Sequence, residues 1–297
     1  MNQEIEHRAG FVSIVGRPNV GKSSLMNRLV GENLSIVTAK AQTTRHRIMG
    51  ILNGERYQIV YSDTPGILEP KYELHKAMMT FVKVSLEDAD VVLLVTELGE
   101  SFDPVLFRPL TFVKVPLILL INKCDLGKID KAKAQAEAWS KHLTIAHTLI
   151  VSAKTGQGVN QVLPSIIERM PLHPGFFPKD DLTNRSERFF ASEIIREKIF
   201  LQYDQEIPYS CEVMIDAFKE EPNLLRISAT IFVERDSQKG IVIGKGGSSL
   251  KEVGSKARID LERFFDRKVF LETHVKVATD WRKQKDRLRA FGYVEGI

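Results

Sequence analysis

Residues 16–23 constrain the fold of this chain more than any other part of its sequence. They match the pattern G-x-x-x-x-G-K-[ST], with an apolar run at 11–15 before the pattern and a helical stretch at 23–30 after it. Glycines let such a loop curl so that successive backbone N–H groups point at phosphates, and the helix adds its positive N-terminal end. We expect a nucleoside-triphosphate site in which Lys22 reaches the outer phosphates and the Ser23 hydroxyl binds magnesium. The loop consists of Gly16, Arg17, Pro18, Asn19, Val20, Gly21, Lys22 and Ser23.

Apolar runs alternate with helical patterns through the first 170 residues. The runs are near-continuous, as expected of strands that are buried on both faces of a parallel sheet. They lie at 11–15, 47–52, 58–62, 91–96, 117–122 and 148–152, and the helical patterns lie at 23–30, 74–86, 131–141 and 159–168. This alternation predicts a doubly wound α/β domain whose ligand loops lie at the carboxyl ends of the strands.

The motif Asn122-Lys123-Cys124-Asp125 indicates which base is bound. The Asp125 carboxylate can accept two hydrogen bonds, from the ring N–H and the exocyclic amine of guanine. Adenine offers no such pair of donors, so a buried Asp125 would be left unpaired. We expect Lys123 to pack its stem along the base and Asn122 to tether the loop. A backbone contact to the guanine carbonyl is expected from Ser152-Ala153-Lys154, after the sixth apolar run.

Two polar motifs are expected to complete the phosphate and magnesium site. Asp63, after the run at 58–62, can hold magnesium through water, and the Gly66 N–H can sense the terminal phosphate. One threonine, either Thr43 or Thr44, completes the magnesium shell, and we take Thr44 together with Ser23 and Asp63 as the metal ligands. The motifs are Asp63-Thr64-Pro65-Gly66 and Thr43-Thr44-Arg45.

A proline-rich break divides the chain into two predicted domains. Three prolines fall between 171 and 178, and the pattern of apolar residues changes beyond them. We expect a nucleotide domain over 1–172, a linker over 173–185 and a second domain over 186–297. In the second domain, helices are predicted at 186–202, 248–265 and 280–291, and strands at 210–219, 224–234 and 268–278.

Residues 242–250 combine the end of an apolar strand, a G-x-x-G turn and the start of an amphipathic helix. This is the arrangement of KH domains, whose loop clamps the backbone of single-stranded nucleic acid. Glycines let phosphates approach closely, Lys245 adds charge, and the helix N-terminus at Ser248 favours anions. The segment 238–290 also holds twice as many basic as acidic residues, which favours nucleic-acid binding. The expected RNA contacts are Ile243, Gly244, Lys245, Gly246, Gly247 and Ser248.

The nucleotide motifs together resemble those of the translation-factor-like GTPases. Two further stretches resemble the Era-like family in particular: the switch region Lys40-Ala41-Gln42-Thr43-Thr44-Arg45-His46-Arg47, and residues 188–198. The likeness runs from about residue 11 to residue 294. It implies a P-loop GTPase domain followed by a smaller α+β KH domain of type II, and an enzyme that hydrolyses GTP slowly with Mg²⁺.

The resemblance also implies which residues act in hydrolysis. They are Lys22, Thr44, Gly66 and Asn19. In Ras-like proteins a glutamine after the D-x-x-G motif orients the attacking water. Here that position is Ile67, which cannot do so, and Era-like proteins share this lack. In related GTPases an asparagine at the position of Asn19 holds a potassium ion; here Asn19 is either such a ligand or a residue that shapes the loop.

The partners implied by the resemblance are single-stranded RNA from the 3′ end region of 16S rRNA and the immature small (30S) ribosomal subunit. Peripheral association with the inner membrane is known in the family, although no stretch here resembles an anchor, and a cytoplasmic monomer is expected.

The apolar stretches are far shorter than the ~20 residues that cross a bilayer. Residues 1–10 show no signal-peptide pattern, and Cys124 and Cys211 have neither a pairing pattern nor metal-ligand spacing, which suits a reducing compartment.

Two other functions compete with this hypothesis. A non-catalytic RNA-binding adaptor, whose nucleotide domain serves only stability, would bind GTP without turnover. An ATP-dependent kinase or ATPase that shares only the phosphate loop would show no preference for guanine. Thr44, Asp63 and Gly66 argue against the first, and Asn122 and Asp125 argue against the second.

Overall fold

The computed structural model describes residues 6–293, and the chain forms two compact units. The first contains the residues up to Lys71 and Met78–Asn184, and the second contains Tyr72–Ala77 and the residues from Arg185 onward. The first unit is α/β and the second is α+β, which confirms the predicted fold class. Among the described residues, no helix is long and apolar enough to cross a membrane.

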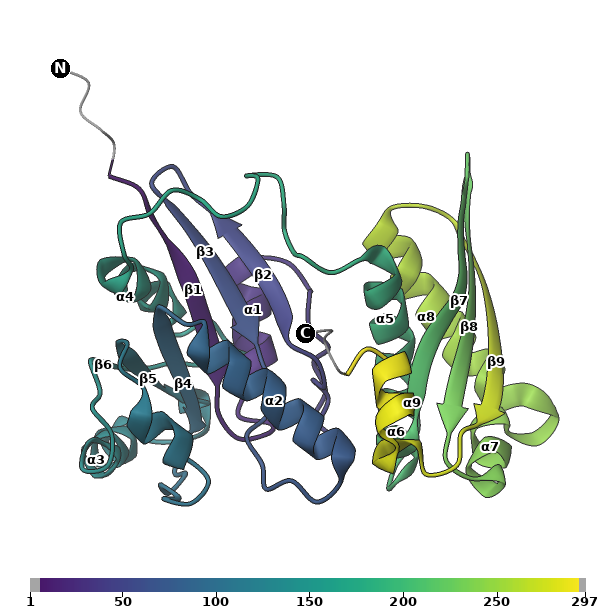
Figure 1. Cartoon of the computed structure of the whole chain (residues 1–297), viewed down its shortest axis with the longest axis horizontal. Helices are drawn as coiled ribbons and strands as arrows, with labels where there is room; N and C mark the ends of the chain where they lie inside the picture. Colours follow the sequence, from purple (N-terminus) through teal and green to yellow (C-terminus); the bar gives the residue numbers. More distant parts are fainter. Residues whose placement is uncertain (1–5, 294–297) are drawn as a thin grey trace. The chain divides into compact units, whose positions relative to one another are not determined.

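A six-stranded sheet forms the centre of the first unit (Figure 1). Its strands run in the order β2-β3-β1-β4-β5-β6, and all neighbours are parallel except β2 and β3. The bounds are β1 Arg8–Val15, β2 Ile48–Asn53, β3 Tyr57–Asp63, β4 Val91–Glu97, β5 Leu117–Asn122 and β6 His147–Ile150. Only residues 54–56 join β2 to β3, and so short a connection permits only antiparallel pairing. The parallel pairing expected of these runs therefore holds for the other strands but not for β2.

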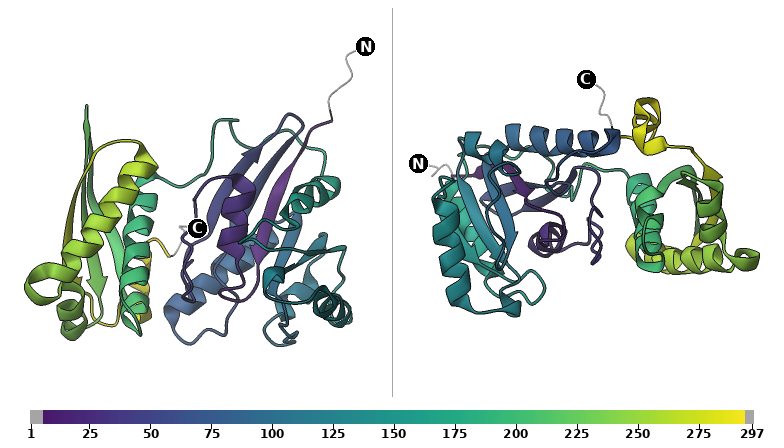
Figure 2. Two further views of the ribbon diagram at one scale, coloured as in Figure 1. Left: turned by 180° about the vertical axis from the view of Figure 1, so that it is seen from behind. Right: turned by 90° about the horizontal axis from the view of Figure 1, so that it is seen from below.

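Helices cover both faces of this sheet. They are α1 Lys22–Val30, α2 Glu73–Glu87, α3 Ile129–Ser140 and α4 Val162–Arg169, with 3-10 turns η1 Arg108–Phe112, η2 Cys124–Leu126 and η3 Val159–Gln161. On one face, Val82 of α2 and Trp139 of α3 share an apolar core with Val92 and Leu94 of β4. The other face carries α1, which is visible from behind in Figure 2. Four of the five predicted nucleotide motifs begin at or just after the carboxyl ends of β1, β3, β5 and β6, and the fifth, at 43–45, lies between α1 and β2.

Residues 173–184, nearly all of the predicted linker, are held by the first unit. The side-chain oxygen of Gln58 on β3 accepts the N–H of Phe176 at 2.6 Å. The carbonyl of Leu182 accepts the N–H of Ile51, on the edge strand β2, at 2.8 Å. This segment is therefore a fixed part of the first unit's surface.

A three-stranded sheet and two long helices form the second unit. The strands β7 Glu212–Glu221, β8 Leu224–Val233 and β9 Val269–Val277 lie in that order, with β7 and β8 antiparallel and β8 and β9 parallel. The helices are α5 Glu187–Gln202, α6 Ile207–Ser210, α7 Asp236–Ile243, α8 Ser248–Phe265 and α9 Lys285–Ala290, with 3-10 turns η4 Lys245–Gly247 and η5 Trp281–Lys283. Helices α5 and α8 lie along one face of the sheet (Figure 1) and bury Ile195, Ile199, Ala257 and Leu261 against it.

The predicted strand end before the G-x-x-G turn is in fact the last turn of a helix, α7. The Gln238 side chain accepts the backbone N–H groups of Glu234 and Arg235, at 2.9 and 3.0 Å, and so stabilises the start of this helix. Within its apolar end, Val242 is fully buried while Ile241 is 53% exposed. Three consecutive apolar residues made the segment look like a strand, but the G-x-x-G turn joins two helices.

Candidate guanine-nucleotide site

The predicted nucleotide motifs meet at one cavity of about 650 Å³ in the first unit. The predicted residues that line it are Pro18, Asn19, Gly21, Lys22, Ser23, Thr43, Thr44, Gly66, Asn122, Lys123, Asp125, Ser152, Ala153 and Lys154. The predicted residues that do not line it are Gly16, Arg17, Val20, Asp63, Thr64, Pro65 and Cys124. The cavity therefore brings together every predicted motif, although not every residue of each.

Asn122 binds three loops together at the base of this cavity. Its Nδ2 donates to the Val20 carbonyl at 2.7 Å, and its Oδ1 accepts the Ala153 N–H at 2.8 Å. Gly21 makes room for it: φ there is 98°, and a Cβ would lie 2.2 Å from Asn122 Nδ2. The tethering expected of Asn122 is thus made by two buried hydrogen bonds. The Ala153 N–H, one of the expected contacts to the guanine carbonyl, is engaged by Asn122.

Lys22 lies buried behind the phosphate loop. Its Nζ donates to the carbonyl oxygens of Arg17, at 2.9 Å, and Gly16, at 3.3 Å. Burial lowers the pKa of Lys22 to about 8, and the negative charge of Asp63 partly opposes this. An anion bound beside the ammonium would stabilise its protonated form. The charge of Lys22 is therefore coupled to phosphate binding.

The three predicted magnesium ligands lie within hydrogen-bond distance of one another. Ser23 Oγ donates to Asp63 Oδ2 at 2.6 Å and lies 2.9 Å from Thr44 Oγ1. Thr44 Oγ1 is 3.5 Å from the same carboxylate oxygen. The neighbouring Thr43 instead donates to the carbonyl of Lys40 at 2.8 Å. Of the two threonines left open by the sequence, Thr44 is the one that faces the cluster.

The Asp63 carboxylate is suited to a divalent cation. It is fully buried, and burial raises its pKa. Its Oδ1 makes no hydrogen bond within the described part of the chain, although the Ser35 hydroxyl is near enough to oppose the rise in pKa. A buried acceptor without a donor is unfavourable, and a bound cation removes that penalty. Carboxylate and hydroxyl oxygens are also the donors that Mg²⁺ prefers, so these residues fit a magnesium ion.

Asp125 is exposed, which corrects the buried carboxylate assumed from the sequence. Asp125 lies in the 3-10 turn η2, and the Ser152 hydroxyl donates to Asp125 Oδ1 at 2.6 Å. Lys123, which is expected to lie along the base, forms an ion pair with Glu97. The carboxylate is therefore open to a ligand, and the penalty assumed for a buried, unpaired Asp125 does not arise from the protein alone.

Residues 63–66 pack directly against the phosphate loop. A Cβ at Gly66 would lie 2.5 Å from the backbone nitrogen of Pro18, so only glycine fits this approach. The Ile67 N–H donates to the Gly16 carbonyl at 2.9 Å. The Ile67 side chain is buried in the apolar core, so it cannot orient a water molecule.

Two residues of α1 organise the site without belonging to any motif. Arg28 donates to the carbonyl oxygens of Ala153, at 2.8 Å, and Lys154, at 2.9 Å. Asn27 accepts the N–H of Ser35 at 2.9 Å and donates to the carbonyl of the same residue at 2.8 Å. The one feature of the sequence that could have pointed to these two residues is their polar character in the last turns of the helix after the phosphate loop.

Asn19 connects the phosphate loop to the switch region. Its Nδ2 donates to the Ala39 carbonyl at 2.9 Å, and its backbone has a φ of 64°. Positive φ is tolerated better by asparagine than by most residues. The residue therefore has a loop-shaping role, and its side chain lies beside a backbone carbonyl oxygen.

In the second unit, the loop at 244–247 leaves its backbone open at Gly246 and Gly247. At these two positions no atom of a non-adjacent residue, within the part of the chain that the structure describes, lies within 4 Å of the place that a Cβ would occupy, whereas a Cβ at Gly244 would lie 2.3 Å from Ser249 Oγ. Lys245 is exposed, and helix α8 begins at Ser248 with no acidic residue in its first turn. The loop can therefore admit a phosphate close to its backbone and next to a helix N-terminus.

A second cavity of the first unit has a volume of about 1080 Å³, and of the predicted nucleotide residues Arg17 and Pro18 line it. It lies between α2 and residues 103–115, and its lining is mostly apolar, including Val82, Leu86, Leu106 and Phe112. Pro18 lines both cavities, so the phosphate loop forms part of the wall of each.

Two family models match the chain. Residues 11–123 match the family described as 50S ribosome-binding GTPase, and residues 206–282 match the family described as KH domain. The "GTPase Era" of Syntrophus aciditrophicus (strain SB) is 45% identical over 296 residues, which cover 98% of this chain and 97% of that protein. The "GTPase Era" of Staphylococcus haemolyticus is 42% identical over 294 residues, which cover 98% of each chain.

Two solved structures are similar to nearly the whole chain. One is a variant of Era from Aquifex aeolicus bound to GDP·AlF4⁻, with a TM-score of 0.93. The other is Era in complex with MgGDPNP and nucleotides 1506–1542 of 16S ribosomal RNA, with a TM-score of 0.92. Each is 38% identical to this chain and covers 97% of it, while this chain covers 100% of each.

Proposed function

Because this chain belongs to the Era family of GTPases, we propose that it is a GTP-hydrolysing switch that binds the 3′ end region of 16S rRNA and assists assembly of the small (30S) ribosomal subunit. The related structure that contains 16S rRNA nucleotides supports this choice of RNA. The family model described as 50S ribosome-binding GTPase matches residues 11–123 alone. Since the expected RNA contacts lie in the second unit, we favour the small subunit.

The observation that carries the proposal is the cluster of Ser23, Thr44 and Asp63 beside Lys22. Two hydroxyls and a buried carboxylate oxygen converge within 2.6–3.5 Å of one another. We infer that these three residues hold the Mg²⁺ that accompanies the nucleotide, and a bound Mg²⁺ neutralises charge on the outer phosphates. Lys22, whose ammonium is close enough to Asp63 for the two charges to interact, adds a second positive charge, and the Gly66 N–H would contact the terminal phosphate.

Slow intrinsic turnover is expected because Ile67 stands where Ras-like proteins have a glutamine. Ile67 is buried in the core and cannot orient the attacking water. We propose that Asn19 compensates in part by holding a potassium ion near the phosphates, and its loop-shaping contact with Ala39 is the alternative role.

For the RNA we propose the open loop of the second unit, with contacts from Ile243, Gly244, Lys245, Gly246, Gly247 and Ser248. We further propose a GTPase domain over 1–172, a linking segment over 173–185 and a KH domain over 186–297. In the cell we expect a cytoplasmic monomer that binds the small subunit and associates peripherally with the inner membrane.

The decisive experiment combines RNA binding with GTP hydrolysis. The double variant Gly246→Asp with Gly247→Asp places two carboxylates where phosphates must approach, and we expect it to lose binding to a 16S 3′-end oligonucleotide. Basal hydrolysis should stay within about twofold, roughly 0.4 kcal/mol of barrier. Gly31→Asp is the matched control, because Gly31 also has a positive φ and open space around it but lies in the first unit.

Filter binding across a salt series reports the number of phosphate contacts. If the double variant keeps the wild-type affinity and salt slope, RNA binds elsewhere. If the wild-type protein binds GTP without any turnover, the chain is an adaptor and the catalytic part of the proposal is wrong.

A further inference from the structure

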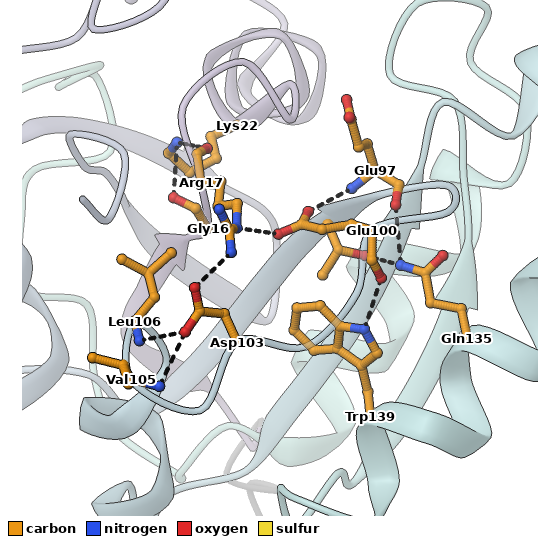
Figure 3. Close-up of polar contacts among 11 residues, drawn as sticks. Gly16, Arg17, Lys22, Glu97, Glu100, Asp103, Val105, Leu106, Gln135 and Trp139 are labelled. Carbon is orange, nitrogen blue, oxygen red and sulfur yellow. Dashed lines mark hydrogen bonds and ion pairs between the residues drawn. The ribbon is translucent and has the colours of Figure 1, made fainter. Parts of the chain in front are cut away.

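We propose that Glu100 and Asp103 hold Arg17 in an ionic brace, which positions the terminal-phosphate side of the phosphate loop and thereby sets the preference for GTP over GDP. The brace comprises these three residues (Figure 3). The inference rests on the proposed nucleotide site and adds to it two positioning residues that belong to no nucleotide motif.

Arg17 is the only charged side chain of the loop besides Lys22, and it points at two carboxylates. Its Nε lies 3.0 Å from Glu100 Oε1, and a terminal nitrogen donates to Asp103 Oδ2 at 3.0 Å. The guanidinium carbon also lies 5.8 Å from the centre of the Phe107 ring. The Asp103 contact is a hydrogen bond, whereas the Glu100 contact is an ion pair without hydrogen-bond geometry. A planar guanidinium held at two of its nitrogens is restrained in orientation, which a lysine ammonium would not be.

Each carboxylate uses one oxygen for Arg17 and the other to hold itself in place. Glu100 Oε2 accepts the N–H of Glu97 at 3.2 Å, and the side chain is only 9% exposed. Asp103 Oδ1 accepts the N–H groups of Val105 and Leu106, each at 3.0 Å. Backbone N–H groups therefore hold both carboxylates in place independently of the arginine.

Helix α3 fixes the turn that carries Glu100. Trp139, which is fully buried, donates its Nε1–H to the Glu100 carbonyl at 3.1 Å. One turn earlier, Gln135 accepts the Gly99 N–H at 2.7 Å and donates to the Glu97 carbonyl at 3.0 Å. The brace is thus connected to the core of the unit rather than to a loose surface loop.

From Arg17 the contacts lead to the residues proposed to meet the terminal phosphate. The Arg17 carbonyl accepts Lys22 Nζ at 2.9 Å. The next residue, Pro18, packs against Gly66 so closely that a Cβ there would lie 2.5 Å from the Pro18 nitrogen. The base side of the loop is held separately, by the bond from Asn122 to Val20. Through Pro18 and Gly66, the brace therefore acts on the part of the loop that lies next to the proposed terminal-phosphate contact.

An exposed ion pair of this kind contributes little to stability. Here the pairing differs because Glu100 is nearly buried. Burial raises its pKa, and the hydrogen bond from the Glu97 N–H and the charge of Arg17 both oppose that rise. A purely structural contact would affect binding of both nucleotides equally. A positioning contact should affect GTP more than GDP, and this difference is measurable.

The test measures affinities for GDP and for a non-hydrolysable GTP analogue in Glu100→Gln, Asp103→Asn and their double variant. Both changes keep side-chain size and remove charge, and Asp103, whose side chain is 39% exposed, should tolerate substitution even if Glu100 does not. We expect GDP affinity to stay within about twofold, while analogue affinity falls about tenfold in the double variant, the equivalent of one charge-assisted hydrogen bond. Arg17→Lys should also lower the ratio of GTP-analogue affinity to GDP affinity, because an ammonium cannot bridge both carboxylates.

The matched control is Asp88→Asn, which removes the partner of another arginine, Arg47, in the same unit. It should leave the ratio of GTP-analogue to GDP affinity unchanged. Equal weakening of both nucleotides in the brace variants, or no weakening of either, would overturn the positioning role. If the wild-type protein binds neither nucleotide, it is the proposed function that fails, and the brace falls with it.

Discussion

Replacing Asn122 with alanine should disconnect three loops at once. The side chain is 2% exposed and makes two buried hydrogen bonds, to the Val20 carbonyl and from the Ala153 N–H. Asn122→Ala removes both bonds and leaves both backbone groups buried without a partner. The phosphate loop and the 152–154 loop then lose their common attachment.

The size of the effect follows from those two groups. A buried donor or acceptor that loses its partner costs about 1–3 kcal/mol. Water from the adjoining cavity can satisfy part of this, so we expect a loss of about 3 kcal/mol in the free energy of unfolding. For a unit of this size that corresponds to a fall in Tm of roughly 6–12 °C. GDP affinity should fall at least about tenfold, because the loops must be ordered by the nucleotide itself.

The assay is urea unfolding and thermal melting, with a fluorescent GDP titration on the same samples. Asn53→Ala is the control, since Asn53 also makes two hydrogen bonds, to Lys179 and Gln58, but is partly exposed. It should cost less than about 1 kcal/mol. If the two variants are equally stable and bind GDP equally well, Asn122 does not organise the site.

Three further predictions address the nucleotide chemistry. Asp125→Asn should weaken GTP binding by at least about 2 kcal/mol, because an amide donor then faces the donors of guanine. The same change should improve binding of xanthosine triphosphate. Unchanged GTP affinity in a titration of both nucleotides would refute the guanine assignment. Burial lowers the pKa of Lys22 to about 8, and bound phosphates favour its protonated form. The affinity for GDP should therefore decrease as the pH rises from 7 to 8.5, with proton uptake on binding. Calorimetry in two buffers of different ionisation enthalpy would contradict this if no proton is taken up at pH 8.5. If Asn19 holds potassium, hydrolysis should be faster in potassium than in sodium at equal ionic strength and Asn19→Ala should abolish the difference, whereas equal rates in the two salts would leave Asn19 with its loop-shaping role alone.

The site was predictable because its residues sit in short motifs at the carboxyl ends of parallel strands. Ser23 and Asp63 are 40 residues apart, yet β1 and β3 are neighbours and deliver both to the same edge of the sheet. Thr44 could not be separated from Thr43 in the sequence, because adjacent residues of an irregular loop have no periodicity that says which one points inward. Only the folded chain shows that Thr43 contacts the Lys40 carbonyl while Thr44 lies beside Ser23 and Asp63.

The brace was not predictable, and the reason is general. Arg17 lies in a motif, but Glu100 and Asp103 are common acidic residues in a loop, and nothing in their spacing indicates a partner more than 80 residues earlier.

The end of α7, which was predicted as a strand, has a different origin. A short apolar run satisfies both strand and helix patterns, and the capping contact of Gln238 that selects the helix is not apparent from apolar spacing.

The segment at 173–184 has a consequence for aggregation. β2 is an edge strand, and an edge presents unpaired N–H and C=O groups to any other extended chain. The Leu182 carbonyl occupies the Ile51 N–H, and the Thr183 hydroxyl donates to the Met49 carbonyl at 2.6 Å, so the segment shields part of that edge. A fragment that ends at residue 172 would keep every nucleotide motif and lose this shield. Such a fragment would be prone to self-association through β2, so a soluble first unit should extend at least to residue 184.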